Sequence, residues 1–350
     1  MRWCSTISGA RATPLGRSGT ERLTVLVTGG HGFAGSWLVK ALLGSGEAVR
    51  VLDRPDPRLT DVGTPRPSAL RLLGIEGEVE LFEADLREAD RISRAVRGAD
   101  TVFHLAAQTI VGNAQASPRE AFEVNVLGTW NVLEACREHE VGRVVCASSD
   151  KAYGASDELP YRENLPLRAV HTYDASKAAA DILARSYWSS HGLSVAVTRF
   201  ANLYGGGDLN FSRLIPEAVS AVLDRRRPVI RSDGTPRRDY LYVEDAARAY
   251  LAIAAALDDG SAGGEAFNAG SGRPYAVREV LQLIAGVAGT DLEPDIRGTG
   301  SPGGEIERQY VDSRKLCERT GWRPQVDLEE GLRRTMEWYR EHPEARAPAP

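Results

Sequence analysis

Residues 23–35 read LTVLVTGGHGFAG, in which a short β-branched apolar run is followed at once by a glycine-rich turn. The run predicts a buried strand, and the apolar spacing from residue 33 onward predicts a helix directly after it. Gly29, Gly32 and Gly35 recur at three-residue intervals in the turn. Glycines at such positions let backbone N–H groups and the positive end of the helix approach a pyrophosphate. The stretch therefore predicts a dinucleotide-binding α/β domain.

Strand-like and helix-like segments alternate from this turn to about residue 200. β-branched runs occupy 48–52, 101–106, 143–148 and 194–200, and helical patterns occupy 33–43, 120–139 and 174–190. The alternation predicts parallel strands joined by crossover helices, which form a Rossmann-type doubly wound α/β sheet.

The pattern loosens beyond residue 205, where Gly- and Pro-rich connections separate a segment at 241–257 from an amphipathic stretch at 328–341. We therefore expect a smaller C-terminal α/β substrate lobe that closes over the carboxyl edge of the sheet. Both ends of the chain lack apolar periodicity. The expected units are a disordered tail at 1–20, the dinucleotide-binding domain with the catalytic residues at 21–204, mainly the substrate lobe at 205–343, and a disordered tail at 344–350.

The composition excludes several classes of protein. With 350 residues and 42% hydrophobic content, the chain can bury a sizeable core, and a formal charge of −5 provides no whole-chain basic field for nucleic acid. No apolar run of about 18 residues could span a bilayer, and residues 1–20 lack the apolar centre of a secretory signal, so a cytoplasmic location is expected. Four widely separated cysteines form no disulfide framework or zinc-ligand spacing and are predicted to be free, buried thiols: Cys4, Cys136, Cys146 and Cys317.

Asp53 lies at the end of the second predicted strand, 18 residues beyond Gly35. A carboxylate at this place can accept hydrogen bonds from both ribose hydroxyls of NAD and would repel the 2′-phosphate of NADP, so NAD is the predicted cofactor. Arg54 could instead meet an extra phosphate, or remain a solvated loop cation. Asp85 and Leu86 follow the third predicted strand, where they suit a contact with adenine, and a helix N-cap role is the alternative for Asp85.

Tyr173 and Lys177 lie four residues apart in HTYDASKAAAD, a segment whose alanines favour helix. On a helix the two side chains share one face. Lysine is rare in this chain, since only four of its 43 basic residues are lysines. A phenol has a pKa of about 10, and a nearby ammonium together with the positive nicotinamide ring favours its ionised form. The pair therefore predicts a tyrosine that acts as a base near neutrality.

These motifs occur together with HLAA at 104–107, RFANLYG at 199–205 and RDYLYVEDAARA at 238–249. In combination they resemble the extended short-chain dehydrogenases/reductases over residues 23–340. The resemblance implies a Rossmann-type NAD domain, a smaller nucleotide-sugar lobe, and a homodimer formed through a helix bundle. It also implies further contacts with NAD, at Phe33, Ala34, Leu105, Ala106, Ala107 and Asn125.

The same resemblance implies roles for individual residues. Ser149 would hold the 4-hydroxyl of the sugar and Tyr173 would remove its proton. Lys177 would bind the nicotinamide ribose and lower the pKa of the tyrosine. In the second lobe, Asn202 and Arg238 would contact the nucleotide diphosphate, the arginine as a bidentate partner of phosphate oxygens. Arg237 is an alternative to Arg238 in this role. Further candidates for substrate contacts are Leu214, Ile215 and Arg308.

The triplet Ser149-Asp150-Lys151 indicates the reaction. Sugar-nucleotide 4,6-dehydratases have a similar triplet of Ser or Thr, an acid, and a second acid/base residue that is commonly Glu. These enzymes oxidise carbon 4, remove the proton on carbon 5, expel the 6-hydroxyl with help from an acid, and return the hydride to carbon 6. Asp150 suits the acid, and Lys151 suits the base if burial or a nearby cation lowers its pKa. The alternative is that Asp150 caps a turn and Lys151 points to solvent.

The lysine at the third position of this triplet resembles the one in CDP-glucose 4,6-dehydratases. These enzymes also carry elements comparable to GGGD at 205–208 and LIP at 214–216. CDP-glucose is therefore the preferred substrate. The chain departs from the family at Thr172, where proline usually precedes the tyrosine, and in RFAN, where glycine usually precedes Asn202. Both departures leave the identity of the nucleotide sugar open.

Two alternatives to the dehydratase are of different kinds. An epimerase or decarboxylase of the same fold would need the 4-keto intermediate but no acid at position 150. A non-enzymatic NAD-binding sensor would need neither Tyr173 nor Lys177. No metal is expected in any of these cases, because His104 is predicted to pack near the cofactor and neither it nor His171 is expected to ligate a metal.

Overall fold

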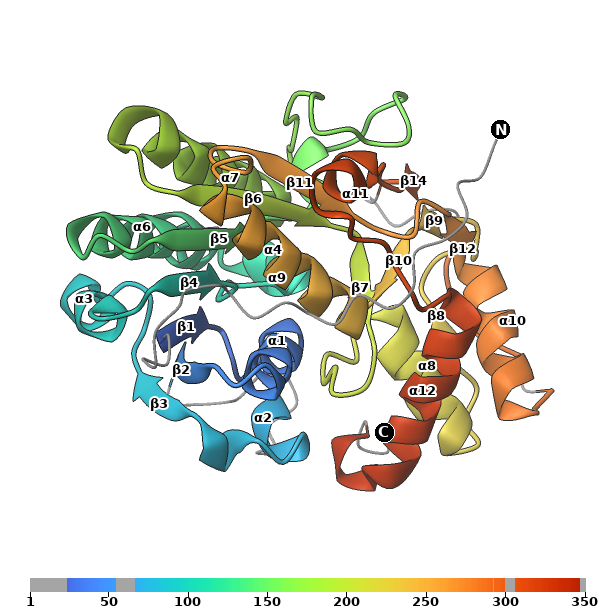
Figure 1. The fold of residues 1–350 in the computed structure, drawn as a ribbon. Helices are drawn as coiled ribbons and strands as arrows, with labels where there is room; N and C mark the ends of the chain where they lie inside the picture. The colour runs from blue at the N-terminus through green and yellow to red at the C-terminus, as the bar shows by residue number, and fades with distance from the viewer. Residues whose placement is uncertain (1–23, 55–66, 292, 300–305, 347–350) are drawn as a thin grey trace.

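The computed structural model describes residues 24–54, 67–291, 293–299 and 306–346, and its centre is a seven-stranded sheet (Figure 1). All neighbouring strands of this sheet run parallel, so the predicted doubly wound α/β fold is confirmed. The order across the sheet is β11 (Ala266–Ala269), β6 (Val195–Phe200), β5 (Arg143–Ala147), β4 (Thr101–His104), β1 (Thr24–Thr28), β2 (Ala48–Asp53) and β3 (Glu80–Glu83).

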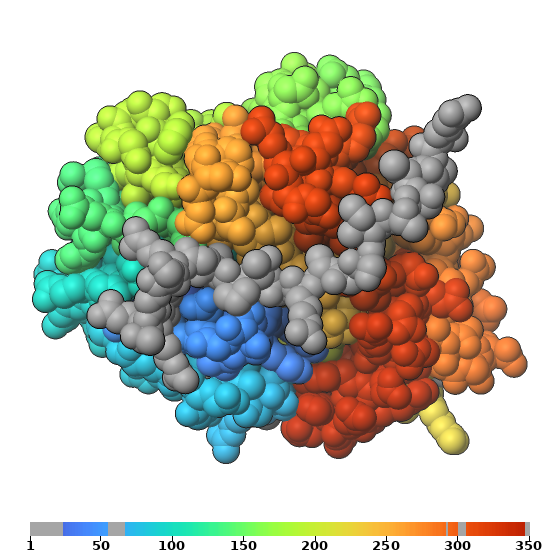
Figure 2. All heavy atoms as spheres, viewed as in Figure 1, coloured from blue at the N-terminus to red at the C-terminus, as the bar shows by residue number. Residues whose placement is uncertain are grey.

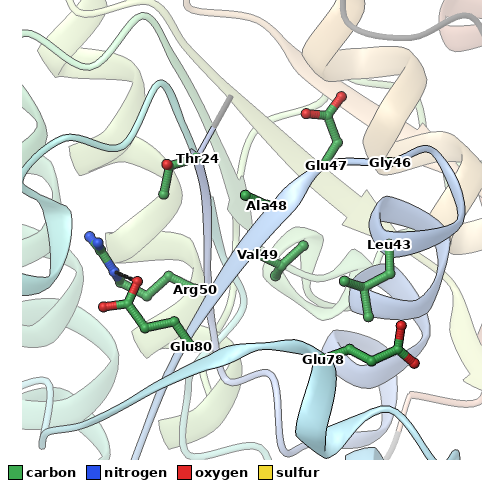
Figure 3. Close-up of a pocket in the computed structure, with 9 residues that line it drawn as sticks. All are labelled: Thr24, Leu43, Gly46, Glu47, Ala48, Val49, Arg50, Glu78 and Glu80. Atoms are coloured by element: carbon green, nitrogen blue, oxygen red, sulfur yellow. Dashed lines mark hydrogen bonds and ion pairs between the residues drawn. The ribbon is translucent and has the colours of Figure 1, made fainter. Parts of the chain in front are cut away.

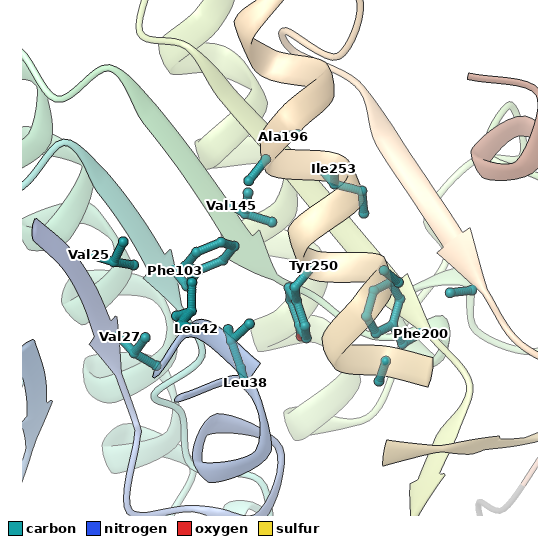
Figure 4. Packing of buried hydrophobic residues seen from close by; sticks show 14 of the residues in the cluster. Val25, Val27, Leu38, Leu42, Phe103, Val145, Ala196, Phe200, Tyr250 and Ile253 are labelled. Atoms are coloured by element: carbon teal, nitrogen blue, oxygen red, sulfur yellow. The ribbon is translucent and has the colours of Figure 1, made fainter. Parts of the chain in front are cut away.

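Helices cover both faces of the sheet because its strands carry apolar side chains on both sides. Val25 and Val27 of β1 face one helix layer, and Leu26 between them faces the other. Figure 4 shows the first layer, in which Leu38 and Tyr250 pack among the strand side chains. This layer contains α1 (Phe33–Gly44) and α9 (Val243–Asp258), and the other contains α3 (Ala89–Val96), α6 (Gly128–Glu138) and α7 (Thr172–His191).

The strand order reverses at β1, because β2 and β3 lie on one side of it while β4, β5 and β6 lie on the other. In open parallel sheets, ligands bind in the crevice outside the carboxyl ends of the strands at this switch point. The glycine-rich turn directly follows β1 and therefore lies at that crevice.

A smaller lobe has its own apolar core and lies to one side of the sheet (Figure 1). Its helices are α8 (Leu214–Leu223), α10 (Val277–Ala288) and α12 (Leu328–Glu341). Its short sheets pair β7 (Asn202–Tyr204) with β10 (Tyr240–Tyr242), β9 (Arg237–Arg238) with β12 (Tyr275–Ala276) and β14 (Arg308–Gln309), and β8 (Val229–Ile230) with β13 (Asp295–Ile296). Short helices elsewhere are α2 (Ala69–Leu72), η1 (Glu76–Glu78), α4 (Val111–Ala116), η3 (Asp150–Tyr153) and α11 (Arg314–Thr320).

Two elements beyond residue 204 belong to the first domain, so a single boundary at 204 does not separate the two parts of the structure. Ala246, Tyr250 and Ile253 of α9 pack into the core beneath the sheet, and β11 adds the strand next to β6. The space-filling view shows the orange and red C-terminal segments on the same face as the blue N-terminal ones (Figure 2). Helix α9 packs against the sheet because this removes its apolar face from water.

Two expected segments differ from the structure. The helical pattern at 120–139 is divided into α5 (Pro118–Phe122), a π-helical turn η2 (Glu123–Leu127) and α6. Residues 344 and 345 do not belong to a tail, because the short helix η4 (Pro343–Ala345) buries Ala345 in the core of the small lobe. The tail expected at 1–20 lies outside the described residues.

The described cysteines are free thiols, and Cys136 and Cys146 are buried while Cys317 is half-buried. Cys4 lies outside the described residues. Among the residues that the structure describes, no helix has the length and apolar content needed to cross a membrane. The same residues contain no group of three or more His, Cys, Asp or Glu side chains arranged to hold a metal ion.

Candidate active site

The glycine-rich turn joins β1 to α1 in a shape that needs glycine. Gly29 has a φ of 76°, and a Cβ at Gly35 would lie 2.2 Å from the carbonyl oxygen of Gly29. Gly32 is the N-cap of α1, so the first amides of the helix, including those of Phe33 and Ala34, have no acceptor within the helix. Free amides at a helix N-terminus beside a tight glycine turn form a cradle for a pyrophosphate. The residues present therefore fit NAD.

Asp53 ends β2 and faces this turn. Its Oδ2 accepts a hydrogen bond from His31 N at 3.0 Å, and its Oδ1 accepts one from Arg54 N at 2.9 Å. Burial raises the pKa of the carboxyl, and His31 and the backbone hydrogen bonds oppose this shift. The position of Asp53 beside the turn supports its predicted contact with ribose, which stays a prediction. Arg54 is exposed next to it.

Asp85 and Leu86 follow β3, as expected from the sequence. Arg87 Nη2 lies 2.8 Å from Asp85 Oδ2, and its hydrogen bonds lower the pKa of the Asp85 carboxyl. The N-cap residue of α3 is Glu88, so the alternative role of Asp85 as that cap is wrong. Leu86 is buried against Gly128 of α6. The predicted adenine contacts of both residues are untested.

The segment after β4 closes the other side of the glycine turn. Leu105 N donates to Thr28 O and Ala106 N donates to Thr28 Oγ1, each at 3.2 Å. A Cβ at Gly29 would lie only 2.7 Å from Ala106 N, so the two segments are in direct contact. Leu105, Ala106 and the half-buried Ala107 therefore lie in the segment beside the turn, and their contact with NAD stays a prediction.

His104 is buried beneath this contact. Its ring nitrogens lie 2.8 Å from Thr28 Oγ1 and 2.9 Å from Thr129 Oγ1. Burial lowers its pKa to about 3, and the positive charge of Lys177 adds to this effect. His104 is therefore a neutral packing residue beneath the cofactor turn, as predicted.

Asn125 lies in η2 and connects the cofactor side of the site to α7. Its Nδ2 donates to Gln108 O at 3.1 Å and to Ser176 Oγ at 2.8 Å, and its Oδ1 accepts from Gln108 N at 2.7 Å. Both amide protons are thus used within the protein, and a contact with NAD could use only the second lone pair of Oδ1. Because Ser176 lies between Tyr173 and Lys177, Asn125 also positions the helix that carries both predicted catalytic residues.

Lys177 and Tyr173 share helix α7, as predicted. Lys177 is 5% exposed, and its Nζ donates to the carbonyl oxygen of Ala147, at the end of β5, at 2.5 Å. Burial lowers the pKa of Lys177 to about 8, and Cys146 and Asp181 oppose this. The ammonium is therefore fixed at the carboxyl edge of the sheet, close to the switch point.

The phenol of Tyr173 has a different environment from the one expected. Burial raises its pKa to about 12, and the strongest opposing effect comes from the guanidinium of Arg213, followed by a hydrogen bond with Ser149. The sequence names Lys177 as the cation that lowers this pKa. Lys177 Nζ donates one hydrogen bond to a backbone carbonyl and keeps its charge, so its predicted effect on the tyrosine stays a prediction.

Ser149, Asp150 and Lys151 form the turn that leads from β5 into η3. Ser149 is the N-cap of η3 and its Oγ accepts from Lys151 N at 3.2 Å, so the alternative in which Asp150 caps the turn is wrong. Ser149 Oγ also donates to Asp150 Oδ1 at 3.3 Å. Lys151 is half-buried, and its ammonium lowers the pKa of both Asp150 and Asp174. Its side chain therefore faces carboxyl groups rather than solvent alone.

Asp150 is only 3% exposed. Burial raises its pKa to about 7, and the nearby charge of Asp239 adds to the shift while Lys151 and Arg238 oppose it. Its Oδ2 is buried and has no hydrogen-bond partner among the described residues. A carboxyl group in this state holds its proton near neutrality and can donate it to a reacting oxygen.

Strands β9 and β14 of the small lobe form the wall of the candidate site that faces Asp150. Arg238 pairs in register with Gln309, and Arg237 pairs with Arg308. Because side chains alternate along a strand, Arg238 and Gln309 share the face toward Asp150, and Arg308 points to the other face. Arg237 lies 3.3 Å from Glu279 Oε2, so Arg238 is the better placed of the two neighbours. The proposed substrate contact of Arg308 is therefore not supported.

Gln309 is a residue that sequence reasoning did not single out, although it is 1% exposed and neither its Nε2 nor its Oε1 has a partner among the described residues.

Asn202 Nδ2 donates to the carbonyl oxygen of Asp239 at 3.3 Å, which holds β7 beside β10. Leu214 is half-buried at the start of α8, whereas Ile215 packs in the core of the small lobe. The side chain of Ile215 is therefore not free to contact a substrate.

A cavity of about 390 Å³ lies at the opposite edge of the sheet, at the amino ends of β1 and β2 (Figure 3). Glu47, Arg50, Glu78 and Glu80 contribute to its lining. It contains none of the predicted site residues, and its place at the amino ends of the strands is not where parallel sheets bind their ligands.

The fold and the site together define a class, that of Rossmann-type α/β enzymes with a Ser, Tyr and Lys site beside a dinucleotide cradle. Residues 25–270 match the model of the NAD dependent epimerase/dehydratase family. The chain belongs to this family, and its dependence on NAD follows from that membership.

Similar proteins include both dehydratases and epimerases. A dTDP-glucose 4,6-dehydratase of Streptomyces griseus is 34% identical over 91% of this chain and 94% of its own length. A putative UDP-glucose 4-epimerase of Methanocaldococcus jannaschii is 32% identical over 90% of this chain and 97% of its own. Among solved structures, DesIV, a dTDP-glucose 4,6-dehydratase from Streptomyces venezuelae with NAD bound, is 33% identical, with a TM-score of 0.82 over 93% of this chain and 99% of that one.

Proposed function

We propose that this protein is an NAD-dependent nucleotide-sugar 4,6-dehydratase and that CDP-glucose is its substrate. The observation that carries the proposal is the state of Asp150, a buried carboxyl whose pKa is raised to about 7 and whose Oδ2 has no partner among the described residues. An elimination needs a protonated acid beside the leaving hydroxyl, whereas an epimerase does not. The choice of CDP-glucose rests on the lysine at position 151.

Different residues of the chain would carry out different steps of the reaction. NAD, when bound, would supply the hydride chemistry needed at carbons 4 and 6. Ser149 would hold the 4-hydroxyl while Tyr173 accepts its proton, and Lys177 would bind the nicotinamide ribose. The ketone at carbon 4 acidifies the proton on carbon 5, which Lys151 would accept and then return to carbon 5 as the hydride reaches carbon 6. Asp150 would give its proton to the 6-hydroxyl, which leaves as water.

The substrate would lie between the sheet edge and the small lobe. Arg238 faces this space and would hold the diphosphate as a bidentate cation, with Asn202 and Leu214 beside it. Gln309 shares the strand face of Arg238 and is a further candidate for a polar contact. The named relatives act on dTDP- and UDP-linked sugars, so the nucleotide base is the part of the proposal that needs the most direct test.

The test is a screen of CDP-, dTDP-, UDP- and GDP-glucose with the purified protein and NAD, followed by mass spectrometry. The expected product from CDP-glucose has lost one water, without net accumulation of reduced cofactor. Recovery of every sugar intact would contradict the dehydratase, and loss of water from another nucleotide sugar alone would contradict only the choice of CDP.

A second candidate is an epimerase or decarboxylase, which the epimerases among the similar proteins favour. Asp150→Asn separates the candidates. Severe loss of turnover supports elimination, and unchanged turnover supports the alternative. The presence of both Tyr173 and Lys177 in the site argues against a non-enzymatic NAD sensor, and turnover of any nucleotide sugar would dismiss that possibility.

We also propose that the protein forms a homodimer through the outer faces of η2, α6 and α7. Trp130 is 53% exposed and Ile182 is 59% exposed, with Leu127 close in sequence and also exposed. Large apolar side chains are costly to leave in water, and several of them on the adjacent helices α6 and α7 are typical of an interface. Trp130→Glu is expected to give a monomer in light scattering, with Leu81→Glu, an exposed apolar residue on β3, as the control. A Trp130→Glu protein that stays dimeric would contradict this interface.

A further inference from the structure

Gln309 carries a buried amide that the protein itself does not pair. Its side chain is almost completely buried, and within the described part of the chain neither Nε2 nor Oε1 has a hydrogen-bond partner. A primary amide that is removed from water without a partner costs free energy, and a methionine of similar size would not have this cost. Such an amide is expected where a ligand completes its hydrogen bonds.

The alternation of side chains shows which way Gln309 points. Arg308 and Tyr310, on either side of it, share one face of the strand, where the guanidinium of Arg308 lies 5.2 Å from the centre of the Tyr310 ring. Val311, two residues after Gln309, is buried in the same cluster as Tyr153 of η3. Because side chains two residues apart share a face of an extended strand, Gln309 lies on the face that meets η3.

Hydrogen bonds hold the end of β14 against the turn that carries Asp150. Tyr161 N donates to Tyr310 O at 2.9 Å, and the hydroxyl of Tyr161 donates to the carbonyl oxygen of Gly154 at 2.6 Å. Gly154 is the C-cap of η3, whose first residue is Asp150. Gln309 therefore belongs to the wall beside the predicted acid.

Gln309 also lies next to the residues predicted to hold the nucleotide diphosphate. It pairs in register with Arg238 in the parallel strands β14 and β9. Gln309 O accepts from Asp239 N at 3.1 Å, and Asp239 O accepts from Asn202 N at 3.2 Å. The amide is thus placed between the predicted diphosphate contacts and the predicted acid, which is where the sugar would lie.

The chemistry of the amide selects the group that it can bind. Nε2 only donates hydrogen bonds and Oε1 only accepts them. Phosphate oxygens accept but do not donate, so a phosphate would leave Oε1 unpaired. Two neighbouring hydroxyls of a sugar can accept from Nε2 and donate to Oε1 at the same time. Carbons 2 and 3 of glucose carry such hydroxyls, between the diphosphate at carbon 1 and the reacting carbons 4 to 6.

We propose that Gln309 is a specificity-determining residue that binds the hydroxyls on carbons 2 and 3 of the sugar. The proposal rests on the proposed function, in which the substrate is a nucleotide-activated glucose. It assigns to the small lobe a selection of the sugar itself, in addition to the contacts with the diphosphate.

The test compares glucose with 2-deoxyglucose, both linked to CDP or to the nucleotide that the screen selects, in the wild type and in Gln309→Met. The measurements are kcat/KM for loss of water and the affinity of the NAD-loaded protein by calorimetry. In the wild type the missing hydroxyl leaves half of a buried amide unpaired, so kcat/KM for the 2-deoxy sugar should be about tenfold to a hundredfold lower. In Gln309→Met the two sugars should differ by less than about threefold, because methionine binds neither hydroxyl. A purely structural role would not remove this discrimination.

Gln282→Met, at an exposed position of α10 in the same lobe, is the matched control and should discriminate as the wild type does. A wild type that handles both sugars alike would overturn the proposal, and this comparison does not depend on the folding of any variant. A folded Gln309→Met protein that still rejects the 2-deoxy sugar would also overturn it, because the amide would then bind only a buried water or the nucleotide base. If no glucose nucleotide in the screen loses water, the proposed function has failed, whereas the affinities of the two CDP sugars still test the contact with Gln309. Circular dichroism of each variant shows whether the fold is retained.

Discussion

Asp150→Asn should make the folded protein more stable while it removes the proposed acid. The ordinary pKa of this carboxyl is 3.8, and burial raises it to about 7. A group whose pKa is higher in the folded state favours folding at low pH, and this advantage is lost as the pH rises through the folded value. Ionised Asp150 therefore destabilises the fold by up to about 4 kcal/mol in alkaline solution.

The size of the effect must depend on pH in a defined way. At about pH 5 the destabilisation from ionising Asp150 is about 1.5 kcal/mol, and at about pH 8.5 it has nearly its full value. Asparagine cannot ionise, so the gain in unfolding free energy on Asp150→Asn should be about 2–3 kcal/mol larger at the higher pH. Any constant effect of the amide on packing cancels in this difference.

Urea unfolding at the two pH values, followed by circular dichroism, measures the difference directly. Asp157→Asn, at an exposed position in the segment that follows η3, is the control and should change nothing with pH. A gain that is the same at both pH values would refute the reasoning, because it would mean that Asp150 has an ordinary pKa in the folded protein and cannot be the acid described above.

The remaining predictions concern the cradle and the core. Gly35→Ala should weaken NAD binding at least tenfold, because the new Cβ would lie 2.2 Å from Gly29 O, whereas Gly44→Ala, later in the same helix and with nothing within 4 Å, should bind normally by calorimetry. Equal affinities would contradict the close fit of the turn. Arg199→Met should lower the free energy of unfolding by about 3–5 kcal/mol, because it leaves Asp181 as an unpaired buried charge where the pair now lies at 2.7 Å. A loss below about 1 kcal/mol in urea unfolding would show that Asp181 finds another partner or a proton.

Local patterns predicted the parts of the site that lie on one element. The glycine turn, Asp53 and the pair on α7 depend on short spacings, and the fold places them together because each follows or flanks a parallel strand. Ser149 and its neighbours likewise follow directly from the end of β5. These residues could be found from the sequence because strand ends meet at one edge of such a sheet.

The parts that the sequence did not predict depend on how separate elements meet. The register of β9 against β14 decides that Arg238 and not Arg237 faces the site, and it turns Arg308 away while bringing Gln309 in. Ile215 lies in a core that forms only when α8 packs on its neighbours. The charge of Arg213 lowers the pKa of Tyr173 from a position 40 residues later in the chain, so no local spacing could have indicated this effect.

The central claim is an oxidation at carbon 4 that is coupled to loss of water across carbons 5 and 6. It is tested most directly with CDP-glucose that carries deuterium at carbon 4, followed by NMR of the product. We expect a 4-keto-6-deoxy sugar in which the deuterium has moved to the carbon 6 methyl group. An intact hydroxymethyl group at carbon 6, with the deuterium still at carbon 4 of glucose or of its epimer, would contradict the account.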